Sequence, residues 1–225
     1  YGLLLAYLGI EHVRYPGFLE PLEGAALRHI DLVAHGQPPY PRPDATFIGL
    51  PYMPLYYAAS APLYLLFGDS FAGPRLVSCF SALAAGGILW WITRRESGTS
   101  LYAWIALGLY CSAYVLMDAW LTCALPDSFL LLWILLGFCF LAYGTSWTHD
   151  LLWILCFTLA FWIKQPGALF FGFAVLYALF LRENAIPRWS IVLGIVLGGP
   201  VAYYGAGEQL GDGFFYLTYE LPGRW

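Results

Sequence analysis

The chain has 225 residues, of which 60% are hydrophobic and 11% charged, and its mean hydropathy is +0.67. Soluble domains are typically about 45–50% apolar and about 25% charged, so these charges are too few to cover a water-facing surface. The formal net charge of −4 excludes the basic footprint of a nucleic-acid-binding protein. The composition therefore predicts an all-α, polytopic bundle of transmembrane helices, with residues 1–225 as a single membrane domain.

The two ends of the chain suggest that it is part of something longer. Residues 1–10 are apolar, but they are too few to cross a bilayer, which takes about 20 residues. We interpret them as the end of a first transmembrane helix whose start is missing. Residues 207–225 are expected to form an outer loop. We therefore expect a fragment with about seven spans, the first one partial.

Residues 11–71 are expected to form a large first outer loop. Within it, residues 21–35 predict an amphipathic helix in the membrane interface, because Pro21 suits a first helical turn and Gly36 a helix end. At helical spacing the charged residues of this segment share one face. They are Glu23, Arg28, Asp31 and His35.

Residues 50–67 are long enough to span a bilayer, but three prolines each remove a backbone donor from this run. Its tyrosines suit a membrane interface, where the ring is buried and the hydroxyl remains in contact with water. We therefore predict a juxtamembrane or re-entrant segment at 50–67.

Six apolar runs separated by short polar turns predict six further spans within 72–206. Their lengths carry this prediction, because periodicity is uninformative for helices that are apolar all round. The runs are 72–93, 101–119, 127–144, 150–163, 166–181 and 189–206.

The arginines orient these spans. Arg94, Arg95, Arg182 and Arg188 fall in turns on one side, which should be cytoplasmic by the positive-inside rule. The opposite, outer face then receives the first loop, the turns 120–126 and 164–166, and the closing loop.

Carboxylates on the outer face are candidate catalytic groups. Glu23 lies on the interfacial helix, and Asp127 opens a span. Each has a structural alternative, because Glu23 suits the solvated face and a carboxylate at a helix start is stabilised by about 0.3–1 kcal/mol. Asp31 and Asp118 are supporting candidates, and Asp118 ranks below Asp127 because it could simply pair with a neighbour.

The segment Lys164-Gln165-Pro166-Gly167 interrupts an apolar stretch and contains the only lysine. The arm before it would extend only about 20 Å as a helix, whereas the hydrocarbon core is about 30 Å thick. Lys164 should therefore lie below the outer surface. It either extends to the lipid headgroups or binds a phosphate, with Arg42 and Arg75 as partners and Gln165 in support.

The order of these motifs resembles that of the GT-C superfamily of integral membrane glycosyltransferases, near the bacterial protein mannosyltransferases and the lipid A aminoarabinose transferase. The matching segments are Leu22-Glu23-Gly24-Ala25-Ala26, Ala34-His35-Gly36-Gln37, Pro51-Tyr52-Met53-Pro54-Leu55-Tyr56-Tyr57, Leu66-Phe67-Gly68-Asp69-Ser70, Pro74-Arg75-Leu76, Leu125-Pro126-Asp127 and Ile163-Lys164-Gln165-Pro166-Gly167. Many members have Asp-Glu where this chain has Leu22-Glu23.

The resemblance implies an enzyme that moves a sugar from a polyprenyl-phosphate donor to a lipid, glycan or protein acceptor at the outer face. Glu23 and Asp127 would be catalytic, and Lys164, Arg42 and Arg75 would bind the donor phosphate. No soluble cofactor motif is present, although Mg²⁺ or Mn²⁺ between the two carboxylates is an open alternative. The scattered His and Cys residues do not form a zinc pattern.

Two non-enzymatic alternatives stay open. The chain could be a structural or assembly subunit with partner subunits in a larger membrane complex. A transporter is the weaker alternative, because no inverted repeat is visible and the charges gather at one face. Under every alternative the protein lies among membrane lipids, in the plasma membrane or bacterial inner membrane, and binds no nucleic acid. A glycosyltransferase would act at the periplasmic or extracellular face.

Overall fold

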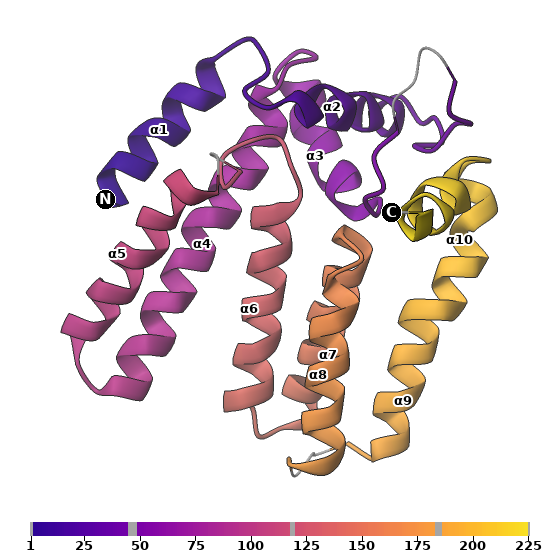
Figure 1. Ribbon diagram of the computed structural model, residues 1–225. Helices are drawn as coiled ribbons and strands as arrows, with labels where there is room; N and C mark the ends of the chain where they lie inside the picture. Colours follow the sequence, from indigo (N-terminus) through magenta and orange to yellow (C-terminus); the bar gives the residue numbers. More distant parts are fainter. Residues whose placement is uncertain (1, 45–48, 118–119, 183–185, 225) are drawn as a thin grey trace. The chain divides into compact units, whose positions relative to one another are not determined.

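The computed structural model describes residues 2–44, 49–117, 120–182 and 186–224, and that part of the chain is helical with no β-strand (Figure 1). The α-helices are α1 (Gly2–Arg14), α2 (Pro21–Ala34), α3 (Leu55–Leu66), α4 (Ala72–Ser97), α5 (Ser100–Leu116), α6 (Asp127–Tyr143), α7 (Trp147–Ile163), α8 (Gly167–Phe180), α9 (Arg188–Val196) and α10 (Ala202–Leu210). A π-helical segment, η1 (Leu197–Val201), joins α9 to α10, and η2 (Tyr216–Glu220) and η3 (Pro222–Arg224) follow.

The all-helical prediction is confirmed for the described residues. Two helices are long and apolar enough to cross a membrane, as judged by length and composition alone: Ala72–Ser97 and Trp189–Leu210. Helices α6, α7 and α8 are apolar but shorter. The count of seven spans and the single membrane domain therefore stay predictions.

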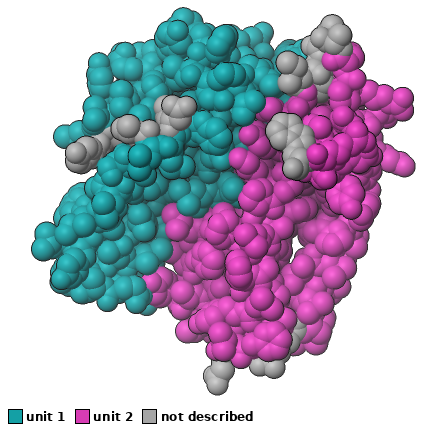
Figure 2. All heavy atoms as spheres, viewed as in Figure 1, with its two compact units in different colours: residues 1–37, 56–132 teal, residues 38–55, 133–225 magenta. Residues whose placement is uncertain are grey.

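The helices gather in two compact units, which Figure 2 colours separately. Unit 1 comprises residues 1–37 and 56–132, and unit 2 comprises residues 38–55 and 133–225.

In unit 1, α4 and α5 form a helical hairpin, and α1 packs along α4 (Figure 1). The hydroxyl of Tyr110 on α5 donates to the carbonyl of Ala82 on α4 at 3.0 Å. The helix predicted over 21–35 is observed as α2, with Pro21 as its first residue; its place in the membrane interface stays a prediction. Helix α3 begins only after Pro51 and Pro54 and contains Pro62, so the prolines shorten the predicted segment 50–67 to one helix of 12 residues.

We expect Gly73→Ala to destabilise unit 1. A Cβ atom at Gly73 would lie 2.5 Å from the backbone carbonyl carbon and oxygen of Leu63, so the start of α4 would have to move away from α3. Overpacking of this kind costs about 1–3 kcal/mol. The measurement is thermal unfolding of the detergent-solubilised protein, followed by circular dichroism.

The matched control is Gly87→Ala on the same helix. No atom lies within 4 Å of a Cβ added at Gly87, and alanine is favoured over glycine in a helix by about 1 kcal/mol. This variant should melt at or above the wild-type temperature. Equal melting temperatures for the two variants would contradict the close approach of α3 and α4.

In unit 2, α7 and α8 form a second hairpin. Its turn is tight, because a Cβ at Gly167 would lie 2.4 Å from the backbone of Ala160. Tyr40 fixes the loop before α3 to the segment after α10: its N–H donates to Leu210 O at 3.0 Å, and its carbonyl accepts from Gly213 N at 2.9 Å. Trp162 on α7 donates to the carbonyl of Gly198 in η1 at 2.8 Å.

Candidate functional site

Glu23 and Arg75 form a fully buried ion pair in unit 1. Glu23 lies in the first turn of α2, and Arg75 lies near the start of α4. The pair is bidentate: Nε of Arg75 donates to Oε1 of Glu23 at 2.9 Å, and Nη2 donates to Oε2 at 2.6 Å. Two parallel charge-assisted bonds fix the relative orientation of the two side chains. The pair therefore joins α2 to α4.

The remaining N–H groups of Arg75 donate to backbone carbonyls at the end of α1 and in the loop after it. Nη1 donates to His12 O at 2.8 Å and Tyr15 O at 2.7 Å, and Nη2 donates to Gly17 O at 2.6 Å. A guanidinium has five N–H donors. These bonds, together with the two to Glu23, use all five, which leaves none for a phosphate.

The carboxylate of Glu23 is equally saturated. Besides Arg75, it accepts from Leu19 N at 2.6 Å and from Ala124 N at 2.6 Å. A carboxylate offers about four acceptor sites, and all are occupied here. Burial alone would raise the pKa of Glu23, but the hydrogen bonds from Arg75, Ala124 and Leu19 lower it overall. The side chain is suited to hold three segments together as an ionised group.

Asp127 begins α6, as predicted, and is partly buried. The bond from Ala124, three residues earlier, to Glu23 shows that α2 and the turn 120–126 come together within unit 1. Asp118, the supporting candidate, lies outside the described residues.

Asp31 lies on the polar face of α2 among charged and hydroxyl groups. It pairs with Arg28 at 2.5 Å and with His35 at 3.1 Å, and it accepts from the Tyr64 hydroxyl at 3.3 Å. The hydrogen bond of His35 to the Asp31 carbonyl, with the charges of Asp31 and Asp69, raises the pKa of His35. This cluster forms the polar face of α2.

The predicted cations lie in different surroundings. The ammonium of Lys164 lies 4.5 Å from the ring centroid of Tyr52 in unit 2. Arg42, also in unit 2, pairs with Asp212 at 3.4 Å, and both side chains are more than 70% exposed. Arg75 belongs to unit 1. Gln165, the predicted support for Lys164, donates to the carbonyls of Pro51 and Thr218.

A second buried ion pair, between Asp150 and Arg182, was missed at the sequence level. Asp150 is fully buried in the first turn of α7, and Arg182 follows α8. Asp150 also accepts from Ile186 N at 3.2 Å, and Arg182 donates to Gly144 O at 2.6 Å. A charged carboxylate at membrane depth is unfavourable unless it is paired. The position of Asp150 at the start of an apolar run could therefore have indicated a partner.

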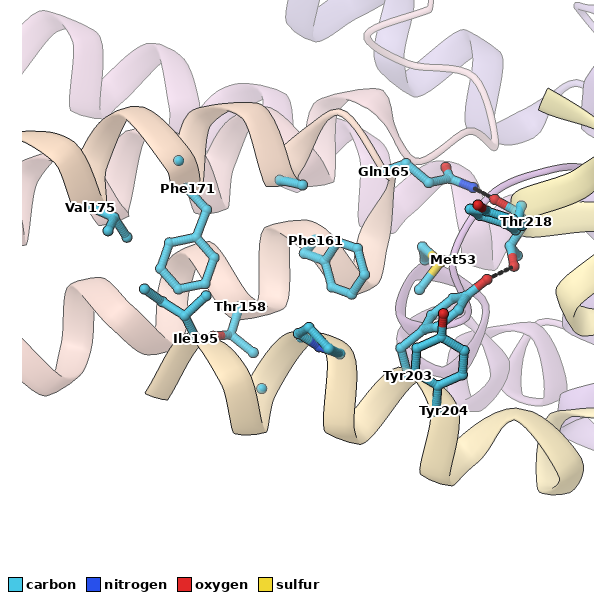
Figure 3. A pocket seen from close by; sticks show the side chains of 16 residues that line it. Met53, Thr158, Phe161, Gln165, Phe171, Val175, Ile195, Tyr203, Tyr204 and Thr218 are labelled. Carbon is cyan, nitrogen blue, oxygen red and sulfur yellow. Dashed lines mark hydrogen bonds between the residues drawn. The ribbon is translucent and has the colours of Figure 1, made fainter. Parts of the chain in front are cut away.

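Unit 2 also contains a cavity of about 480 Å³, lined mainly by aromatic and aliphatic side chains (Figure 3). Its walls come from α7, α8 and the continuous helix α9–η1–α10. Among the described residues, no group of three or more His, Cys, Asp or Glu side chains could hold a metal ion. Among the described residues, two buried ion pairs and this apolar cavity are therefore the main candidate sites.

Comparisons with known proteins point to a class of membrane protein other than the predicted glycosyltransferases. No family model and no solved structure matches this chain. The vitamin B12 import system permease protein BtuC of Pectobacterium atrosepticum is 29% identical over 140 residues, which are 61% of this chain and 39% of that protein. The chain thus spans well under half the length of this relative.

This finding corrects the glycosyltransferase prediction. The resemblance to the GT-C superfamily finds no support, and the named relative is a transport permease. The motifs behind that resemblance consist largely of apolar residues, Gly and Pro, which are frequent in transmembrane helices of every function. The catalytic and phosphate-binding roles that it implied for the outer-face carboxylates and cations depended on that function and have no basis without it.

Proposed function

We propose that this chain belongs to the membrane-embedded permease of an import system in the inner membrane. The similarity over 140 residues to the vitamin B12 import permease carries this proposal. On this proposal, the chain passes a solute across the bilayer and works with other components of the system. The predicted partner subunits then become the remaining parts of a transport complex, in place of a sugar-lipid donor.

The surface chemistry supports a bilayer environment. Large apolar side chains are exposed along α5 and α8, including Leu101, Ile105, Leu109, Phe173 and Leu176. Exposed apolar surface of this extent is unfavourable in water but suits lipid. The buried charges of the two ion pairs are matched within each unit, as expected where water is excluded.

The test is uptake of radiolabelled vitamin B12 by bacteria that lack their own vitamin B12 permease and express this protein. We expect uptake above that of cells with an empty vector, and we expect excess unlabelled vitamin B12 to suppress it. Uptake equal to the empty vector, with the protein confirmed in the membrane fraction, would contradict vitamin B12 as the solute that this chain passes.

A further inference from the structure

The cavity of unit 2 has the size of a small-molecule site. Its volume of about 480 Å³ falls within the range of roughly 300–1,000 Å³ that is usual for ligand pockets. Apolar and aromatic side chains dominate its lining, among them Phe161, Phe171, Val175 and Ile195 (Figure 3). Such a lining favours a hydrocarbon ligand over a polar one.

Polar groups gather at one end of the cavity. Figure 3 shows Gln165, Tyr203 and Thr218 at one end, and Phe171, Val175 and Ile195 towards the other. The hydroxyls of Tyr203 and Thr218 lie 2.8 Å apart, and Gln165 donates to Thr218 O at 3.2 Å. The cavity is therefore amphipathic along its length, with hydrogen-bonding groups at one end and hydrocarbon at the other.

The hollow depends on missing side chains in two of its walls. Gly172 on α8 and Gly199 in η1 both line the cavity, and no atom lies within 4 Å of a Cβ added at either position. The segment η1 is also π-helical. Such turns are rare and are often found at functional sites. Space for a ligand is thus created by the backbone of two helices.

A lysine is the chain neighbour of Gln165 at the polar end of the cavity. Lys164 precedes the lining residue Gln165, and Tyr52 precedes the lining residue Met53. The Lys164 ammonium lies 4.5 Å from the Tyr52 ring centroid, so the two chain neighbours of these lining residues contact each other. The chain has no other lysine. An anionic head group at this end would meet a complementary charge.

We propose that this cavity binds a single-chain fatty acid, with its hydrocarbon chain along Phe171, Val175 and Ile195 and its carboxylate towards Lys164. A methylene group takes up about the volume of a water molecule, about 30 Å³. The cavity of about 480 Å³ therefore has room for one hydrocarbon chain and not for the two chains of a phospholipid. This site is independent of the proposed transport function.

The test is photolabelling of the protein in phosphatidylcholine nanodiscs with palmitic acid that carries a diazirine in its chain. Mass spectrometry then maps the labelled peptides. We expect label on α8 and on α9–η1–α10 near the cavity, and decanoate should compete with it. Decanol, which has the same chain without the charge, should compete less.

Three glycine variants locate the site. Gly172→Leu and Gly199→Leu fill the cavity and should lower labelling there by about tenfold or more, because one surplus methylene in a fitted apolar pocket can cost that much. Gly205→Leu is the matched control, since Gly205 lies on α10 with no atom within 4 Å of an added Cβ and does not line the cavity. Lys164→Gln should remove the preference for decanoate over decanol.

Two results would overturn the proposal. Labelling that the two cavity-filling variants leave unchanged would show adsorption to the lipid-facing surface. Equal competition by decanoate and decanol in the wild-type protein would exclude a carboxylate-specific site. Vitamin B12 uptake by the same variants is scored separately, so a failure of this site and a failure of the proposed transport are distinguishable.

Discussion

Glu23→Gln is expected to destabilise unit 1 by about 3–5 kcal/mol, because removing one member of a buried ion pair leaves the other charge uncompensated. Arg75 would keep its bonds to three carbonyls but lose the carboxylate that balances its charge. The new side-chain amide would also present an N–H₂ group to Ala124 N or Leu19 N, which are both donors. The measurement is the free energy of unfolding by urea titration in detergent micelles.

The matched control for this prediction is Glu11→Gln, also in unit 1. Glu11 pairs with Arg14 at 3.9 Å, and the two side chains are 47% and 75% exposed. An exposed pair contributes about 0–1 kcal/mol, so this variant should unfold close to the wild type. A Glu23→Gln variant as stable as Glu11→Gln would show that the buried pair does not hold α2 and α4 together.

The parts of the fold that the sequence predicted are those where residues at the helix ends, such as Pro and Gly, mark the boundary. Pro21 and Gly36 mark the ends of α2, and the Pro166-Gly167 pair separates α7 from α8. Boundaries were less accurate where polar residues begin a helix: α7 starts at Trp147 and not at residue 150, because its first turn is polar. Local chemistry at helix ends is readable from sequence, since it acts over one or two turns.

The buried ion pairs were not predicted, because their members are far apart in sequence. Glu23 and Arg75 were assigned to the outer face as separate site groups, and their separation of 52 residues gives no hint of a contact. The same holds for Asp150 and Arg182, which are 32 residues apart. Polarity at a single position shows that a partner is needed, but only the packing of helices identifies it.

The cavity could not be predicted for a related reason. Gly172 and Gly199 look like ordinary helix glycines in the sequence, and they become walls of one hollow only when α8 packs near η1. Composition and span pattern indicated a membrane protein, but the assignment to glycosyltransferases depended on short apolar motifs. Chemistry that would support that assignment, an accessible base beside an accessible cation, is absent at the saturated pair of Glu23 and Arg75.

Asp150→Asn is the second substitution for which we expect a large effect, with about 3–5 kcal/mol of destabilisation in unit 2. Asp150 is fully buried and pairs with Arg182, whose side chain is only 9% exposed. The pair ties the start of α7 to the end of α8, and its further bonds reach Gly144 and Ile186. Loss of the negative charge would therefore loosen the chain where α6, α7, α8 and α9 end or begin. Urea titration in micelles measures this effect as well.

Asp212→Asn is the control within the same unit. Asp212 pairs with Arg42 at 3.4 Å, but the side chains are 73% and 81% exposed, so the change should cost no more than about 1 kcal/mol. Unfolding of Asp150→Asn at the same urea concentration as Asp212→Asn would contradict a structural role for the buried pair. A large loss for Asp150→Asn alone would instead show that the buried charges of unit 2 hold its helices together.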